Sequence, residues 1–288
     1  MFEDKLKVYR EEINNTLKEL LKRLKNEDCS IICEAMEYSL LEGGKLLRPV
    51  LTLSVCDMFK KDFKIALPFS CAVEFIHVGS LVHDDLPCMD DDEQRRGKAS
   101  CHVKFNEAAA VLAGDSLFCS SFEVLTYAKE YGLGEKEILE AVLLLAKMFG
   151  TKGILAGQDM DMFSQIENSK ENVKEMVEKV AKYKTASLIK AACNLGAIAA
   201  GANLEEIEIL DKFADYFGIC FQIKDDILDF EQDAKKEEKR LDFVHIFGIE
   251  KANDLAVEYT KKAIECLKKF NGSEFLIELT KKALHRKS

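Results

Sequence analysis

The sequence predicts an all-α protein, and three observations support this prediction. Apolar residues recur three or four positions apart from the start of the chain, as at Leu6, Tyr9, Ile13 and Leu17, with charged residues between them. The chain contains only three prolines, all before residue 88, so its later part lacks the residue that most strongly interrupts helices. Alternation of apolar and polar residues is not sustained, and we therefore expect no sheet.

The helical pattern continues through most of the chain. Beyond the N-terminal stripe, we expect helices at 31–41, 50–59, 66–83, 108–130, 136–149, 173–200, 205–230 and 251–269. Turn residues separate them at 43–44, 87–97 and 131–134, and a charged run covers 231–240. None of these breaks is long enough to be a linker, so we expect a single domain over residues 1–288.

Composition indicates a soluble globular protein and excludes several partners. Apolar residues make up 48% of the 288 positions, which is enough for a sizeable core. The formal net charge of −10 argues against a surface that binds nucleic acid, because such binding depends on clustered Lys and Arg. We therefore expect no nucleic-acid partner.

Cysteine usage and the N-terminus indicate a cytoplasmic location. Ten cysteines are spread through apolar helical patterns without a CxxC pair, as expected for reduced thiols in a core. The N-terminus mixes both charge signs and lacks the apolar run of a secretory signal. The apolar stretch at 187–204 contains Lys190 and Asn194, which favours a buried helix over a membrane span.

The first candidate site is an acidic cluster that follows a helical apolar run. Asp84, Asp85, Asp90, Asp91 and Asp92 place five carboxylates within nine positions, and two arginines follow shortly after. A solvated acidic loop is the simplest alternative. Carboxylates at a helix end suit a hard cation such as Mg²⁺, which takes few protein ligands and prefers substrate phosphates for the rest.

A second acidic cluster lies within a continuous helical pattern. Asp225, Asp226 and Asp229 lie three, four and seven positions after Gln222. These four residues therefore share one helix face. Like charges stacked in this way destabilise a helix unless a cation lies near them. One DDxxD motif is a weak signal, whereas two on apolar helices predict a metal-dependent site.

Basic residues accompany the acidic clusters, as binding of a phosphate group requires. Lys45 and Arg48 follow the glycine pair at 43–44, although a helix end with surface charges is an equally good explanation of that motif. His77 lies two helical turns before Asp84 and points the same way, although a lone His in a core helix is more often structural. The polar pair after residue 183 indicates a local helix distortion, or alternatively an ordinary polar face.

Taken together, these segments resemble the short-chain trans-isoprenyl diphosphate synthases, especially bacterial farnesyl diphosphate synthases. The resemblance covers most of the chain and rests on GGKLLRP, HDDLPCMDDDEQRRG, AVLAGDSL, GQDMD, KT and FQIKDDILD, which occur in family order. It implies an isoprenoid-synthase helical bundle around a central cavity, and a homodimer. It also implies Mg²⁺ as the cofactor, with three ions bound when substrate is present.

The resemblance also implies a role for each candidate residue. Asp84, Asp90 and Asp225 match the direct metal ligands, with Asp85 and Asp229 in support. Lys45, Arg48, His77 and Arg96 match the site for isopentenyl diphosphate, whereas Arg95 and Lys184 match groups that hold the allylic diphosphate. Thr185, Gln222 and the Lys184 carbonyl match groups that face the developing allylic cation.

One departure from the family concerns the segment after the second motif. The family usually has a longer loop there, with a Gly-Lys-Ser/Thr segment that contacts the allylic diphosphate. Here the charged run at 231–240 leads directly into residues 241–243. Lys239 is the best candidate for the missing lysine, with Lys235 and Lys236 as competitors.

The implied reaction is the head-to-tail condensation of isopentenyl diphosphate with dimethylallyl or geranyl diphosphate. Farnesyl diphosphate is the favoured product. Geranylgeranyl diphosphate is the alternative, because Gly79 and Ser80 stand where farnesyl-producing enzymes often place an aromatic residue. A small residue there is expected to open the product tunnel. More remote alternatives are a class I terpene cyclase and a non-catalytic helical binding subunit, both of which normally lack part of the motif set found here.

Overall fold

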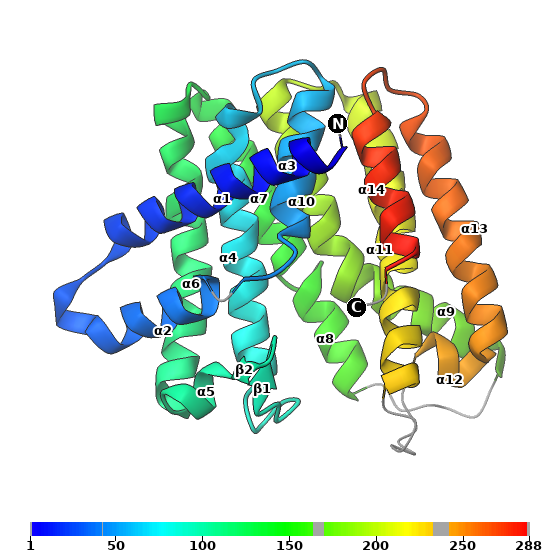
Figure 1. Ribbon diagram of the computed structural model, residues 1–288, viewed down its shortest axis with the longest axis horizontal. Helices are drawn as coiled ribbons and strands as arrows, with labels where there is room; N and C mark the ends of the chain where they lie inside the picture. The colour runs from blue at the N-terminus through cyan, green and yellow to red at the C-terminus, as the bar shows by residue number, and fades with distance from the viewer. Residues whose placement is uncertain (1, 42, 164–169, 233–241, 287–288) are drawn as a thin grey trace. The chain divides into compact units, whose positions relative to one another are not determined.

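The all-α prediction is confirmed by the computed structural model, which describes residues 2–41, 43–163, 170–232 and 242–286 (Figure 1). In chain order the α-helices are α1 (Phe2–Leu24), α2 (Ser30–Leu41), α3 (Leu47–Met58), α4 (Leu67–Asp84), α5 (Cys101–Lys104), α6 (Glu107–Thr126), α7 (Glu135–Phe149), α8 (Ile154–Phe163), α9 (Lys170–Val180), α10 (Ser187–Ala200), α11 (Leu204–Gln232), α12 (Phe243–Phe247), α13 (Ile249–Leu267) and α14 (Glu274–Leu284). Short 3₁₀ turns cover Glu27–Cys29, Phe63–Ala66 and Tyr127–Tyr131.

The expectation of no sheet was wrong at one place. Strands β1 (Gln94–Arg95) and β2 (Lys98–Ala99) form an antiparallel pair of two residues each. Arg96 and Gly97 connect them with φ angles of 55° and 79°, the positive values that a tight two-residue hairpin turn requires. Strands this short show no alternation of apolar and polar residues, so pattern reading missed them.

Contacts within the chain divide it into two compact units. The first comprises residues 1–57 and 62–142, and the second comprises residues 58–61 and 143–288. The expectation of one domain over residues 1–288 stays a prediction.

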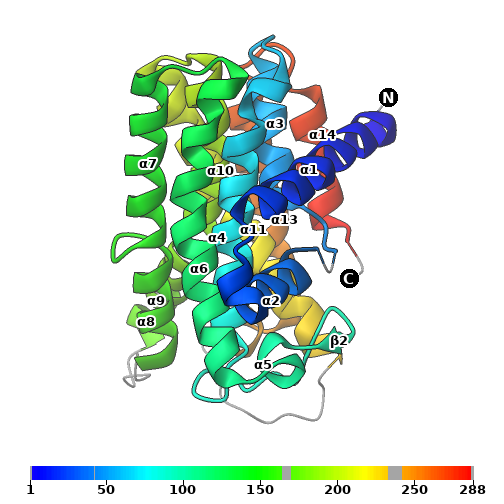
Figure 2. The same cartoon turned by 90° about the vertical axis from the view of Figure 1, so that its left-hand side faces the viewer.

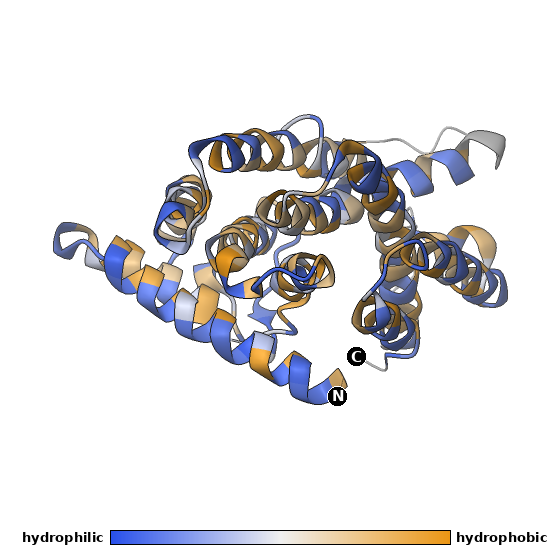
Figure 3. Cartoon of the chain, turned by 90° about the horizontal axis from the view of Figure 1, so that it is seen from above, coloured by the Kyte–Doolittle hydropathy of each residue, from blue (hydrophilic) through white to orange (hydrophobic). Residues whose placement is uncertain are grey.

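The first unit is built around the packing of α4 against α6, which run side by side in Figure 2. Phe69, Phe75 and Ile76 of α4 and Leu117 of α6 are fully buried. The N-terminal stripe is confirmed as the buried side of α1, whose turns alternate between polar and apolar residues in Figure 3. These contacts fix α4, the helix that ends in the first acidic motif.

Two segments of this unit are long and apolar enough to cross a membrane by length and composition. They cover Phe63–Asp84 and Glu107–Tyr131, and 78% and 44% of their apolar windows are buried inside the protein. Core helices of globular proteins pass the same test, so these segments are weak evidence for a membrane span.

The second unit is organised around α11, which packs against α10 and α13. Ile219, Cys220, Ile223 and Ile227 of α11 form a buried cluster with Phe243 of α12 and with side chains of α13. The stretch predicted as one helix at 173–200 is instead α9, a π-helix at Ala181–Ala186, and α10. The structure thus confirms the distortion expected near Lys184. Helices α8, α12 and α14 were not anticipated, because they are short and flanked by glycine or charged residues.

Candidate active site

The first acidic motif forms a compact turn at the end of α4. The backbone N–H of Asp90 donates to the carbonyl of Asp84 at 2.9 Å, and the N–H of Met89 donates to the carbonyl of Leu86 at 2.8 Å. Asp84 is half-buried and Asp90 is exposed. The structure therefore brings together the two residues predicted to be direct metal ligands in this motif, although their metal-binding role stays a prediction.

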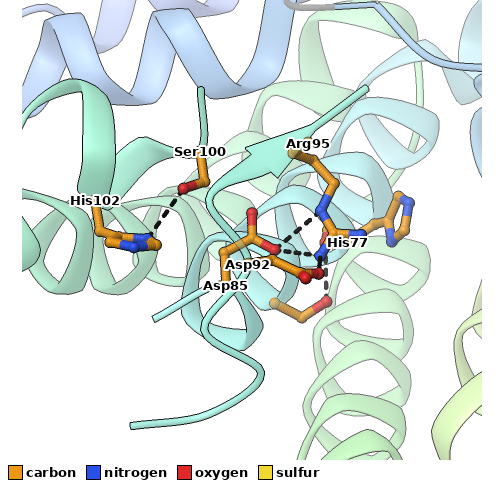
Figure 4. A network of polar contacts seen from close by, with 7 residues as sticks. His77, Asp85, Asp92, Arg95, Ser100 and His102 are labelled. Carbon is orange, nitrogen blue, oxygen red and sulfur yellow. Dashed lines mark hydrogen bonds and ion pairs between the residues drawn. The ribbon is translucent and has the colours of Figure 1, made fainter. Parts of the chain in front are cut away.

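Asp85 has a different environment from these two residues. It is 2% exposed, and its Oδ1 accepts a hydrogen bond from Arg95 Nε at 2.9 Å (Figure 4). The Arg95 guanidinium also donates to Asp92 Oδ2 at 2.9 Å. Burial raises the pKa of Asp85, and the neighbouring guanidinium opposes that effect. This arrangement fits a supporting role for Asp85, which positions Arg95 rather than facing solvent.

The hairpin between β1 and β2 directs Arg96 onto the glycine-rich loop. Arg96 Nη1 donates to the carbonyl of Gly43. Gly44 has a φ of 141°, and a Cβ at this position would lie 2.7 Å from the guanidinium carbon of Arg96. Only glycine leaves room for the arginine there. The glycine pair thus has a structural reason that the sequence alone did not reveal.

His77 contacts another arginine, Arg48. Its Nε2 lies 3.2 Å from Arg48 Nη1. Burial lowers the pKa of His77 well below its usual value, and the nearby Arg48, Arg96 and Arg95 lower it further. The imidazole is therefore neutral at pH 7 and accepts a hydrogen bond from Arg48. Lys45 lies on the glycine-rich loop, and its backbone carbonyl accepts a hydrogen bond from Arg10 Nη2 at 3.1 Å.

Glu74 is a member of this cluster that sequence analysis missed. It is 1% exposed, and its Oε2 has no hydrogen-bond partner among the described residues. Burial raises the pKa of Glu74, while Arg48 and Arg96 are close enough to oppose that rise. A charged residue inside an otherwise apolar run was the available signal. We refer to Arg48, Glu74, His77 and Arg96 as the basic cluster.

The π-helix of the second unit is held by close approach to two glycines. A Cβ on Gly157 of α8 would collide with the backbone of Lys184, and a Cβ on Gly218 of α11 would collide with Ala186. The wide turn therefore fits only where its neighbours lack side chains. Lys184 Nζ forms an ion pair with Asp161 of α8, a partner that sequence analysis did not single out.

A chain of hydrogen bonds links the π-helix to α11. Thr185 Oγ1 donates to Gln222 Oε1 at 2.5 Å, and Gln222 Nε2 donates to Asp226 Oδ1 at 2.8 Å. Asp226 Oδ2 accepts from the N–H of Phe243 at 2.9 Å. Burial raises the pKa of Asp226 to about 7, against the effect of these hydrogen bonds. Thr185 and Gln222 are therefore hydrogen-bonded to each other, and Asp226 holds the Gln222 amide in place.

The remaining aspartates of the second motif lie nearer to solvent. Asp225 is half-buried and Asp229 is exposed. Asp225 Oδ1 lies 2.6 Å from Nη2 of Arg286, which follows α14. The cation that stacked carboxylates require is therefore present in the protein itself. Lys239, Lys235 and Lys236 lie outside the described residues.

The acidic motifs offer carboxylate oxygens, the donor type that Mg²⁺ prefers. Among residues 2–41, 43–163, 170–232 and 242–286, no three His, Cys, Asp or Glu side chains are already grouped around a metal position. Asp84 and Asp90 of the first motif, and separately Asp225 of the second, offer carboxylates that could hold a divalent metal.

Gly79 packs closely against α6, and the expectation that it opens a product tunnel stays a prediction. The ring of Phe118, from α6, fills the position, because a Cβ on Gly79 would lie 2.6 Å from Phe118 Cε1. The small residue is therefore matched by a large one on the neighbouring helix. Reading α4 alone could not reveal this pairing, because it depends on the register between α4 and α6.

Comparison with known proteins identifies the family of this chain. Residues 29–244 match the polyprenyl synthetase family. The chain is 41% identical over 252 residues to geranylgeranyl pyrophosphate synthase 11, chloroplastic, from Arabidopsis thaliana, covering 84% of this chain and 71% of that protein. A geranylgeranyl pyrophosphate synthase from Catharanthus roseus is 41% identical over 249 residues, covering 83% and 69% of the two chains.

Solved structures give the same result. An FPP/GFPP synthase from Zymomonas mobilis has a TM-score of 0.86 and 31% sequence identity, covering 99% of this chain and 100% of that chain. A geranyltransferase from Legionella pneumophila has a TM-score of 0.89 and 29% identity, covering 99% and 98% of the two chains.

The helical fold, the two acidic motifs and these matches define one class of enzyme, the prenyltransferases that act on prenyl diphosphates with a divalent metal. The chain belongs to the polyprenyl synthetase family. It is a prenyl diphosphate synthase of the short-chain trans type.

Proposed function

We propose that the enzyme condenses isopentenyl diphosphate with dimethylallyl or geranyl diphosphate to give farnesyl diphosphate. The observation that carries this proposal is the basic cluster, in which Arg48 contacts neutral His77 and Arg96 lies over Gly44. These groups suit a diphosphate bound without a metal, in addition to the diphosphate that the acidic motifs serve. A class I terpene cyclase has only one diphosphate to bind.

Each set of residues then has a distinct task. Lys45, Arg48, His77 and Arg96 bind isopentenyl diphosphate, whereas Arg95 and Lys184 hold the allylic diphosphate. Asp84, Asp90 and Asp225, with Asp85 and Asp229 in support, would hold three Mg²⁺ ions. These ions would stabilise the negative charge that develops on the leaving diphosphate.

The hydrogen-bonded pair of Thr185 and Gln222 supplies oriented polar groups for the allylic cation. Gln222 is fixed by Asp226, so its amide has little freedom to turn away. After the double bond of isopentenyl diphosphate attacks the cation, a proton leaves for the departing diphosphate. This route requires no protein base, and the neutral His77 is accordingly used for binding.

Geranylgeranyl diphosphate is the second candidate product. The names of the plant relatives favour it, whereas the Phe118 ring at Gly79 favours a shorter product because it occupies space beside α4. The test is chromatography of dephosphorylated products after incubation with Mg²⁺, isopentenyl diphosphate and each allylic primer in turn. Farnesol as the main product supports the proposal, and geranylgeraniol as the main product supports the alternative.

We also propose a cytoplasmic homodimer. Helix α6 leaves apolar side chains exposed, including Val111 at 39% and Leu112 at 49%, which supports association of two copies. Cys56, Cys71 and Cys193 are fully buried core thiols, which supports a reducing compartment. Sedimentation equilibrium tests the dimer: a single species at the mass of one chain would contradict it.

A further inference from the structure

The C-terminal end of the described chain reaches the second acidic motif. Arg286 lies just beyond α14, and its side chain is only 11% exposed. Its Nη2 contacts Asp225 Oδ1 at 2.6 Å and donates to the carbonyl of Phe221 at 2.8 Å. The guanidinium also lies over the Phe221 ring, 3.7 Å from its centroid. Phe221 and Asp225 are one helical turn apart on α11, so a single arginine covers both.

The buried guanidinium of Arg286 is placed to pair with Asp225 in particular. Arg286 Nε is buried and has no hydrogen-bond partner among the described residues. Leaving this polar group unpaired costs free energy, and the contact with Asp225 offsets that cost. A buried guanidinium is retained only where a counter-ion and ring stacking offset its desolvation. Asp226, the neighbouring carboxylate, already has Gln222 and Phe243 as partners. Arg286 therefore serves Asp225 in particular.

We propose that Arg286 is a positioning residue that holds Asp225 in the metal-free enzyme and is displaced when a divalent metal binds. This inference rests on the proposed function, in which Asp225 is a metal ligand. A guanidinium 2.6 Å from Asp225 Oδ1 occupies the region where a metal would bind that oxygen, because metal–carboxylate distances are about 2 Å. The arginine and the metal compete, so Arg286 sets the metal concentration that the enzyme requires.

The competition predicts the direction of a mutational effect. Replacing Arg286 with Gln removes the competing cation, and metal affinity should rise by about fivefold to tenfold. A charge-assisted hydrogen bond contributes more than this on its own, but solvent at the 41% exposed Asp225 screens part of it. The gain should shrink at high ionic strength for the same reason.

The test is a titration of free Mn²⁺ followed by electron paramagnetic resonance, with Mn²⁺ alone and with Mn²⁺ plus inorganic pyrophosphate. The proteins are the wild type, Arg286→Gln, Asp225→Asn, the double variant and Lys281→Gln. The last is a matched control, because Lys281 also lies near the C-terminus but pairs with Glu278. We expect tighter Mn²⁺ binding by Arg286→Gln, little change in Lys281→Gln, and no gain from Arg286→Gln in the Asp225→Asn background.

Three results would overturn the proposal: unchanged or weaker Mn²⁺ binding by Arg286→Gln, an equal gain in Lys281→Gln, or a gain that persists without Asp225. If the wild type condenses both substrates while Arg286→Gln shows one of these results, only this inference fails. Absence of Mn²⁺ binding by the wild type in both conditions would remove the metal site itself, and the proposed mechanism with it.

Discussion

Replacing His77 tests whether the basic cluster binds isopentenyl diphosphate. The structure makes His77 a neutral acceptor for Arg48, because burial and then the nearby Arg48, Arg96 and Arg95 lower its pKa. His77→Gln keeps an acceptor near the position of Nε2, whereas His77→Ala removes it. The two variants therefore separate the hydrogen bond from any role of imidazole charge.

The size of the effect follows from the one hydrogen bond that the alanine substitution removes. A hydrogen bond to a charged group contributes about 1.5–3 kcal/mol, which corresponds to about 10- to 150-fold in kcat/KM. His77→Ala should show this loss for isopentenyl diphosphate and little change in KM for the allylic substrate. His77→Gln should lose no more than about threefold. Steady-state kinetics with each substrate varied in turn measures both. Equal losses in the two variants, or an equal effect on both substrates, would refute the reasoning.

The lowered pKa of His77 also predicts how stability depends on pH. The folded-state value lies below the ordinary 6.5, so the unfolded protein binds this proton more readily. The contribution of His77 is fully present above pH 6.5 and declines as the pH falls below it, by up to about 1.4 kcal/mol per pH unit. Urea unfolding at several pH values should show a smaller decline in His77→Gln than in the wild type. Parallel curves would contradict the assignment of a neutral imidazole.

Three further predictions concern the acidic motifs, the product and the π-helix. Asp84→Asn and Asp225→Asn should each lower turnover by at least about 10²-fold with unchanged circular dichroism, and near-normal turnover at saturating Mg²⁺ would exclude them as ligands. Phe118→Ala should give longer products on chromatography if its ring limits the chain, whereas an unchanged product would place the limit elsewhere. Gly157→Ala should lower the free energy of unfolding by about 1–3 kcal/mol, because the added carbon meets the Lys184 backbone, and a stability equal to the wild type in a thermal melt would contradict this close approach.

Features set by local spacing along one helix were predictable from the sequence. The helical period placed His77 two turns before Asp84, and α4 carries both as expected. The polar pair Lys184 and Thr185 indicated a distortion, and a π-helix is present there. Both inferences needed only the chain's own period and residue types.

Features that depend on contacts between distant segments were not predictable. The Phe118 ring at Gly79 reflects the register of α6 against α4, and Arg286 reaches Asp225 only because α14 ends beside α11. The buried Glu74 gains its meaning from two arginines elsewhere in the chain. Sequence spacing carries no information on such contacts. The apolar run around Glu74 indicated that its charge is buried, but not which residues are its partners.

Release of inorganic pyrophosphate tests the central claim most directly. The enzyme is incubated with Mg²⁺ and geranyl diphosphate alone, with isopentenyl diphosphate alone, and with both. Two-substrate condensation predicts rapid release only with both substrates, accompanied by one equivalent of a longer prenyl diphosphate for each pyrophosphate. Equal release from geranyl diphosphate alone, with a cyclic hydrocarbon as the product, would contradict the account and indicate a terpene cyclase. No release under any condition would indicate a non-catalytic subunit.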